Sequence, residues 1–190
     1  MKRRILSLFV ALCLIAALLP MSVLAASYTD TDGHWAESSI ERWSDAGVVQ
    51  GTGDAFAPDS DLTCAQLATI LAKLLRLPAA DDAGFSDNLA DAWYYDAINR
   101  CAAAGILNGY ADGTVRPNET ISRARAMVML ARALGIEPAG TSVLNGYADA
   151  ANVPDWARGY VAALLRADIV SGVSGSRLAA LANITRAQFV

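Results

Sequence analysis

The heptapeptide ITRAQFV at residues 184–190 decides how this chain is organised. Two related stretches precede it, LTCAQLA at residues 62–68 and ISRARAM at residues 121–127. Tryptophans at 35, 93 and 156, and the Asp residues that precede them, recur with the same spacing. A period of about 60 residues shared by several landmarks indicates an internal repeat. The sequence therefore predicts three copies of one structural element.

Each copy predicts a helix, a turn-rich loop and a second helix. In the second copy, Trp93, Ile98 and Cys101 are spaced to form one apolar stripe along a helix that begins at the Trp. A glycine ends this helix in the first two copies, at Gly47 and Gly105, as a left-handed C-terminal cap requires. The loop that follows is rich in Asn-Gly and Asp-Gly, which favour tight turns.

The repeated heptapeptide has the pattern of a helix start. Thr63 with Gln66, and Thr185 with Gln188, fit a capping box, in which the hydroxyl accepts from the third amide and the Gln reaches back to the cap. The leucines and isoleucine at positions 67–75 then recur at helical spacing and predict a face that packs against a core.

No single copy can bury its apolar stripes alone, so we expect the three to pack together. The predicted fold is all-α, with three helix-loop-helix repeats at residues 28–77 (repeat 1), 85–136 (repeat 2) and 147–190 (repeat 3). The second helix of repeat 1 is expected to run to about residue 76, so repeat 3 is expected to be incomplete at Val190.

Residues 1–25 have the pattern of a secretory signal peptide. A basic start at residues 2–4 precedes an apolar run at 5–19, and Val23 and Ala25 are small residues at a cleavage position. We expect cleavage near Ala25 or Ala26. The run is shorter than the roughly 20 residues of a membrane span, although a retained N-terminal anchor is the alternative.

Charge and cysteine content exclude several classes. Removing the three basic residues of the signal leaves 12 basic residues of the 15 against 19 acidic ones, a net charge of −7. An acidic chain of this kind argues against nucleic acid as a partner. Two cysteines remain, Cys64 and Cys101. One disulfide between them is possible, but two separate buried thiols are the favoured interpretation.

Catalytic and metal-binding patterns are missing from the sequence. The single histidine, His34, has no nucleophile or metal-ligand cluster to join. Residues 30–33, DTDG, begin like a calcium loop but lack its fifth-position ligand and its terminal Glu spacing. We interpret them as a turn and helix cap, and we expect no enzyme activity, no cofactor and no metal.

Taken together, these landmarks resemble the S-layer homology (SLH) domain, and the resemblance covers nearly all of residues 28–190. The three copies read YTDTDGHWAESSI…AGVVQG…FAPDSDLTCAQLA, then FSDNLADAWYYDAI…AGILNGYADGTVRPNETISRARA, then YADAANVPDWARGYV…ADIVSG…NITRAQF. The resemblance implies a pseudo-threefold helical bundle that holds an exported protein at the cell wall or surface layer. The implied ligand is a secondary cell-wall polysaccharide with pyruvate ketals, bound in grooves between neighbouring repeats.

The residue chemistry agrees with this implied ligand. An arginine in the first turn of a helix adds guanidinium donors to free backbone amides and can bind a carboxylate, although a surface salt bridge is the alternative. An indole can lie against a sugar, but a Trp at a helix start is more often core, so packing is the favoured interpretation. The candidate ligand-binding residues are Arg123, Arg186, Trp35, Trp93, Trp156, Asp30, Asp87, Asp149, Gly109, Ser122 and Thr185.

Three positions depart from the family pattern. Cys64 stands where the arginine is expected, Arg125 stands where Glu is usual, and residues 172–177, GVSGSR, lack the Asp-Gly turn and the Pro. Of three expected grooves, only those with Arg123 and Arg186 are therefore expected to keep a cation at the helix start. A secreted helical module that binds protein rather than sugar is the alternative function.

Overall fold

The computed structural model describes residues 28–190, so the predicted signal peptide lies outside the described residues. No strand occurs within these residues, which confirms the helical class. The first helices of the three repeats are α2 (Glu37–Asp45), α4 (Tyr95–Ala103) and α6 (Asp155–Arg166). The second helices are α3 (Cys64–Leu74), α5 (Arg123–Ala133) and α7 (Arg186–Phe189). Two short 3-10 helices, η1 (Thr141–Gly146) and η2 (Ala150–Asn152), precede α6.

The helix ends follow the predicted capping chemistry. Both capping boxes are formed: Thr63 Oγ1 accepts from the Gln66 amide at 3.3 Å, and Gln66 Oε1 accepts from the Thr63 amide at 3.0 Å. Gly47 and Gly105 have φ of 71° and 70°, the left-handed conformation expected of a terminating glycine. The start of α2 and α4 differs from the prediction, since each helix begins two residues after its Trp.

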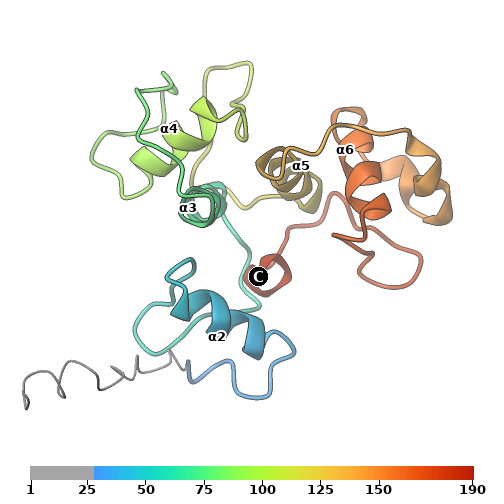
Figure 1. Cartoon of the computed structure of the whole chain (residues 1–190), viewed down its shortest axis with the longest axis horizontal. Helices are drawn as coiled ribbons and strands as arrows, with labels where there is room; N and C mark the ends of the chain where they lie inside the picture. The colour runs from blue at the N-terminus through green and yellow to red at the C-terminus, as the bar shows by residue number, and fades with distance from the viewer. Residues whose placement is uncertain (1–27) are drawn as a thin grey trace, which may run out of the picture.

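Helices pair between repeats rather than within them. Helix α3 packs against α4, and α5 packs against α6. Ala187 of α7 belongs to the same buried cluster as Ile40 of α2. The second helix of each repeat thus meets the first helix of the next, and the last pair joins the two ends of the described chain. Figure 1 shows these three helix pairs arranged around a common centre, with α7 beside the chain end marked C.

A ring of backbone hydrogen bonds closes this centre. The Leu62 amide donates to Ile184 at 2.9 Å, the Ile184 amide to Ile121 at 3.1 Å, and the Ile121 amide to Leu62 at 2.9 Å. All three side chains are buried, and each residue directly precedes the N-cap of a second helix. The cycle supports the pseudo-threefold bundle that the family resemblance implies.

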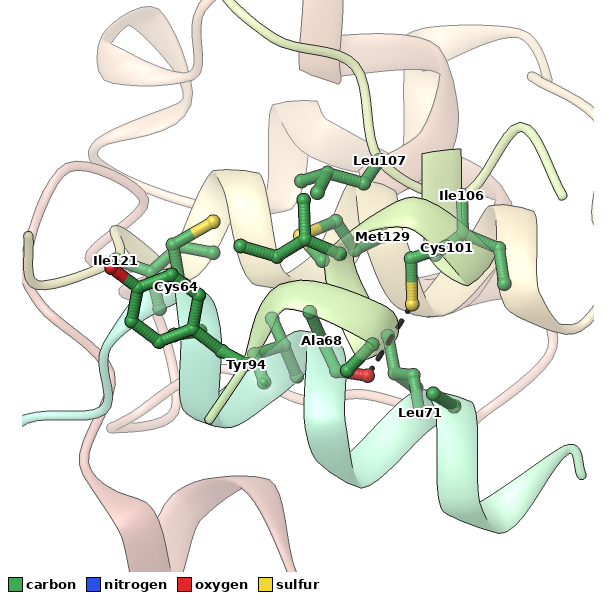
Figure 2. Packing of buried hydrophobic residues seen from close by; sticks show 14 of the residues in the cluster. Cys64, Ala68, Leu71, Tyr94, Cys101, Ile106, Leu107, Ile121 and Met129 are labelled. Carbon is green, nitrogen blue, oxygen red and sulfur yellow. Dashed lines mark hydrogen bonds between the residues drawn. The ribbon is translucent and has the colours of Figure 1, made fainter. Parts of the chain in front are cut away.

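The largest core cluster lies between α3 and α4 and contains both cysteines (Figure 2). The Cys101 thiol donates to the Ala68 carbonyl at 3.3 Å, and burial raises the pKa of Cys101 to about 12. Burial also raises the pKa of Cys64. Both thiols are free, which confirms the interpretation of two separate buried cysteines.

Candidate functional site

An Asp near the start of each repeat closes the loop of the same repeat. The carboxylate of Asp87 accepts from the backbone amides of Val115 and Arg116, both at 2.8 Å. Arg116 has a φ of 54°, so the carboxylate holds the backbone in a left-handed conformation that non-glycine residues rarely adopt. The same pair of bonds joins Asp30 to Phe56 and Ala57 and joins Asp149 to Leu178 and Ala179.

Gly109 also serves the shape of the loop. A Cβ at this position would lie 2.3 Å from Cε1 of Phe85 and 2.6 Å from the Thr114 carbonyl oxygen, so no other residue fits without movement. Gly51 and Gly172 meet an aromatic ring in the same way. Gly109 nevertheless lines a groove, which leaves its role in ligand binding a prediction.

Beside each of the three loops lies a groove that collects residues from different repeats. The repeat-1 groove, of about 540 Å³, combines the loop at 48–57 and Gln66 with Trp93 of repeat 2 and Arg186 of repeat 3. The repeat-3 groove, of about 610 Å³, is built in the same way. Its lining includes the loop at 169–173, Gln188, Trp35 and Arg123.

The repeat-2 groove, of about 410 Å³, keeps the loop and the Trp but has a different set of cations. The loop at 106–110 and Trp156 line it together with Arg125 and Arg132, both from α5. The cation from a neighbouring repeat is missing among its lining residues, as the Cys64 departure predicts.

The two predicted arginines reach across to the loop of the next repeat. Nε and Nη2 of Arg186 donate to the carbonyls of Phe56 and Gln50, both at 2.9 Å, and its guanidinium lies 4.3 Å from the Phe56 ring centre. Nε of Arg123 donates to the Leu178 carbonyl at 3.0 Å, and Nη1 donates to Gln188 Oε1 at 3.3 Å. Each guanidinium has five N–H donors, so donors remain for a ligand.

Neither arginine forms the surface salt bridge that the sequence left open. The ion pairs within residues 28–190 join His34 to Asp59 and join Arg116 to Asp112 and Glu119. Burial lowers the pKa of both Arg123 and Arg186, but an arginine stays charged in proteins. Each groove of this kind therefore holds a positive charge that forms no salt bridge in the described part of the chain. The carboxylate of Asp30, which is held by its own loop, interacts electrostatically with Arg186.

The three tryptophans are exposed, and the interpretation that they pack in the core is wrong. Their exposed fractions are 70% for Trp35, 65% for Trp93 and 56% for Trp156. The following residue of each repeat (Ala36, Tyr94 and Ala157) turns into the core instead. One tryptophan lines each groove, so each indole is available to a ligand.

The first-turn amides of the second helices are not free, which corrects the expectation that they bind an anion. The Arg123 amide donates to Ala182 and the Ala124 amide to Ala180, both at 2.9 Å. The corresponding amides of α3 and α7 likewise donate to another repeat. The hydroxyls of Ser122 and Thr185 accept from the third amide of their helices. The guanidinium groups are thus the donors that remain at these helix starts.

Residues 27–68, 85–124 and 146–190 match the family model of the S-layer homology domain. These three tandem ranges span more than half of the chain. The chain belongs to the S-layer homology family. The match confirms the resemblance that the repeated landmarks predict.

The chain is similar to parts of much longer curated proteins. The chain is 34% identical over 139 residues to a surface-layer 125 kDa protein of Lysinibacillus sphaericus. This match covers 73% of the chain and 12% of that protein. It is 30% identical over 171 residues to an amylopullulanase of Thermoanaerobacterium thermosulfurigenes, a match that covers 85% of the chain and 9% of that protein. It is also 29% identical over 120 residues to a cellulosome-anchoring protein of Acetivibrio thermocellus, a match that covers 60% of the chain and 27% of that protein. The chain thus spans only a small part of each relative.

The family and these relatives indicate a secreted protein attached to the cell surface, and they support an anchoring module. Within residues 28–190, no helix is long and apolar enough to cross a membrane. The same residues hold no cluster of three or more His, Cys, Asp or Glu side chains that could bind a metal.

Several groups that line or anchor the grooves were not predicted from the sequence. The carbonyls of Phe56 and Gln50 anchor Arg186, and backbone acceptors leave no mark in a sequence. Tyr110 and Arg132 face the repeat-2 groove, where the Tyr after the Asn-Gly turn was an available signal.

Proposed function

We propose that this SLH chain is a non-catalytic module that anchors an exported protein to the cell wall by binding a wall polysaccharide with pyruvate ketals. The observation that carries the proposal is that an exposed indole and an arginine that forms no salt bridge within residues 28–190 line the same groove. Trp93 meets Arg186 in the repeat-1 groove, and Trp35 meets Arg123 in the repeat-3 groove.

The chemistry of each groove matches a sugar that carries a carboxylate. A pyruvate ketal presents a carboxylate on a rigid ring, and an arginine that is already held by loop carbonyls can bind it without losing much side-chain freedom. The indole offers an apolar face to the sugar ring and an N–H to a hydroxyl. The net charge of −7 for residues 26–190 gives no long-range attraction to a polyanion. Binding then depends on these local contacts.

The enzymatic activity that one relative's name states is not proposed for this chain. The amylopullulanase shares only 9% of its own length with the chain, so its activity is said of that protein alone. The cellulosome-anchoring protein and the surface-layer protein support the anchoring role.

Two binding measurements test the proposal. The first compares sedimentation of the protein with walls that keep their polysaccharide and with walls stripped of it, and we expect binding only to the former. Equal binding to stripped walls would favour a protein-binding module instead. The second is calorimetry with a disaccharide that carries one pyruvate ketal and with its ketal-free analogue. Equal affinity for the two sugars would contradict the role of the arginines.

A further inference from the structure

Two departures from the SLH pattern concern the same groove. Cys64 occupies the helix-start position of the arginine, but its side chain is buried in the core and does not line the repeat-2 groove. Arg125 is the third residue of α5, where repeats 1 and 3 have Gln66 and Gln188. The repeat-2 groove thus loses a cation from repeat 1 and gains one from its own repeat.

The Asp-closed loops show which backbone carbonyls are equivalent in the three repeats. Phe56, Val115 and Leu178 each donate an amide to the repeat's Asp, and each precedes a residue with positive φ. Arg186 and Arg123 bind the carbonyls of Phe56 and Leu178. The third carbonyl, that of Val115, accepts from Nη2 of Arg125 at 3.5 Å. Arg125 therefore donates to the equivalent carbonyl from the third position of α5, whereas Arg123 and Arg186 do so from the first position of their helices.

Tyr110 holds the Arg125 guanidinium at the groove. The guanidinium carbon lies 4.5 Å from the centre of the Tyr110 ring, and Nη1 donates to the Tyr110 hydroxyl. This stacking resembles that of Arg186 on the Phe56 ring at 4.3 Å. Within residues 28–190, Arg125 forms no salt bridge with a carboxylate.

Two further side chains complete the site. Arg132 of α5 lines the same groove and likewise forms no salt bridge in the described residues. Trp156 is 56% exposed and lies where Trp93 and Trp35 lie in the other two grooves. An indole, a tyrosine and two guanidinium groups thus line one cavity of an acidic protein.

We propose that the repeat-2 groove is a third binding site for a carboxylate-bearing sugar, in which Arg125 replaces the arginine lost at Cys64. Arg125 and Arg132 bind the carboxylate, and Trp156 lies against the sugar ring. The proposal rests on the proposed function, because it assigns the same class of ligand to the third groove. The helix-start cation is missing from this groove, as the Cys64 departure predicts, and Arg125 supplies a cation from the groove's own repeat.

The four tryptophan indoles allow each groove to be observed separately. Trp93, Trp35 and Trp156 each line one groove, whereas Trp43 packs against the α2 core cluster and serves as an internal control. The experiment is a titration of the ¹⁵N-labelled protein with the disaccharide that carries one pyruvate ketal, followed by the indole N–H signals. We expect the Trp156 signal to move and the Trp43 signal to stay.

Arg125→Gln is the decisive variant, because it restores the residue type of the other two repeats. A Gln at this position can close a capping box with Ser122, so the fold should be retained. We expect the affinity read from Trp156 to fall by about 10- to 100-fold, while Trp35 and Trp93 titrate as before. Arg42→Gln removes the same charge from an exposed site on α2. This control should leave the affinities read from Trp35, Trp93 and Trp156 unchanged.

The outcomes separate this inference from the proposed function. Movement of Trp35 and Trp93 without Trp156, or an unchanged Trp156 affinity in Arg125→Gln, would overturn the third site and leave the proposed function standing. Failure of all three signals to respond to the ketal sugar would contradict the proposed function as well.

Discussion

The backbone amide of Leu62 donates to the carbonyl of Ile184 at 2.9 Å, which bonds the helix start of repeat 1 to that of repeat 3. Ile121 of repeat 2 completes the cycle. Because helices also pair between repeats, one repeat alone would leave its apolar faces uncovered. The described residues should therefore fold as one cooperative domain rather than as a series of independent repeats.

Leu62→Ala tests this cooperativity. Leu62 is fully buried, so its truncation should lower the free energy of unfolding by about 2–5 kcal/mol. Denaturant unfolding followed by circular dichroism and by tryptophan fluorescence should give one coincident transition, shifted as a whole. Leu181→Ala, at a residue that is 62% exposed, should change stability by less than about 0.5 kcal/mol. Two separate transitions in the variant would contradict a single domain.

Much of the fold was predictable because its signals are local. The boxes at Thr63 and Thr185 and the glycine caps at Gly47 and Gly105 depend on residues a few positions apart, and the structure has all of them. The pairing of each second helix with the next repeat was not predictable, because any of the apolar stripes could in principle cover any other.

The candidate site was predicted in part for the same reason. Position in the repeat identified Arg123 and Arg186 as residues of interest, and both line grooves. The tryptophans are exposed, contrary to the packing interpretation. The residue that follows each of them, such as Ala36 after Trp35, is buried in the core instead. The Asp residues are engaged by backbone amides more than 25 residues away, which periodicity does not reveal.

The Asp-closed loops should make stability depend on acid pH. Backbone hydrogen bonds hold the pKa of Asp30 and of Asp149 below the usual value of 3.8. A carboxyl group with a lowered pKa in the folded state stabilises the fold above its unfolded pKa, and this stability is lost as pH falls through the folded value. We therefore expect the melting temperature of the protein to fall below about pH 4.

Asp149→Asn isolates one of these loops. The variant should be less stable than the parent at pH 7, and the difference should shrink as pH falls below about 4, since the parent then loses its carboxylate too. Thermal melts between pH 2.5 and 7 measure this. Asp81→Asn, at an exposed linker residue, is the control. A difference that stays constant across this range would show that the charge of Asp149 does not matter.

The buried thiols should be unreactive in the folded protein. A thiolate is the reactive form, and burial raises the pKa of Cys101 to about 12 and raises that of Cys64. We expect a disulfide reagent at pH 8 to modify neither cysteine of residues 28–190 on the timescale of minutes, and to modify both in denaturant. Rapid modification under native conditions would mean that the α3–α4 cluster opens readily.

Arg123 should matter for both stability and binding. It donates to repeat 3 through Leu178 and Gln188 and is only 7% exposed, so Arg123→Ala leaves buried acceptors unpaired and should cost about 1–3 kcal/mol of stability. Loss of the charge-assisted bond should also weaken binding of the ketal sugar by about 10- to 100-fold.

Arg186→Ala and Arg123→Lys refine the test. Arg186→Ala should weaken binding by a similar factor of about 10 to 100 in the repeat-1 groove. Arg123→Lys keeps the charge but not the planar donors, so it should bind more tightly than Arg123→Ala and less tightly than the parent. Calorimetry at a temperature where every variant is folded measures both. Parent-like affinity in both alanine variants would contradict the groove mechanism.

The tryptophans provide the sharpest separation of binding from folding. Trp93 is 65% exposed and lines the repeat-1 groove, whereas Trp43 is half-buried against the cluster of α2 and α7. Trp93→Ala should change the free energy of unfolding by less than about 0.5 kcal/mol, as exposed positions usually do. Trp43→Ala should cost roughly 1–3 kcal/mol, somewhat below the 3–5 kcal/mol of a fully buried Trp.

The order of the two variants should reverse when glycan binding is measured. Trp93→Ala removes the apolar face on which the sugar rests, and we expect its affinity for the ketal disaccharide in the repeat-1 groove to fall by about tenfold. Trp43→Ala leaves every groove intact and should bind like the parent at a temperature well below its melting point. Calorimetry and thermal melts on the same preparations give both readings. If Trp93→Ala melts early and Trp43→Ala loses binding, the indole at 93 serves the fold rather than the ligand.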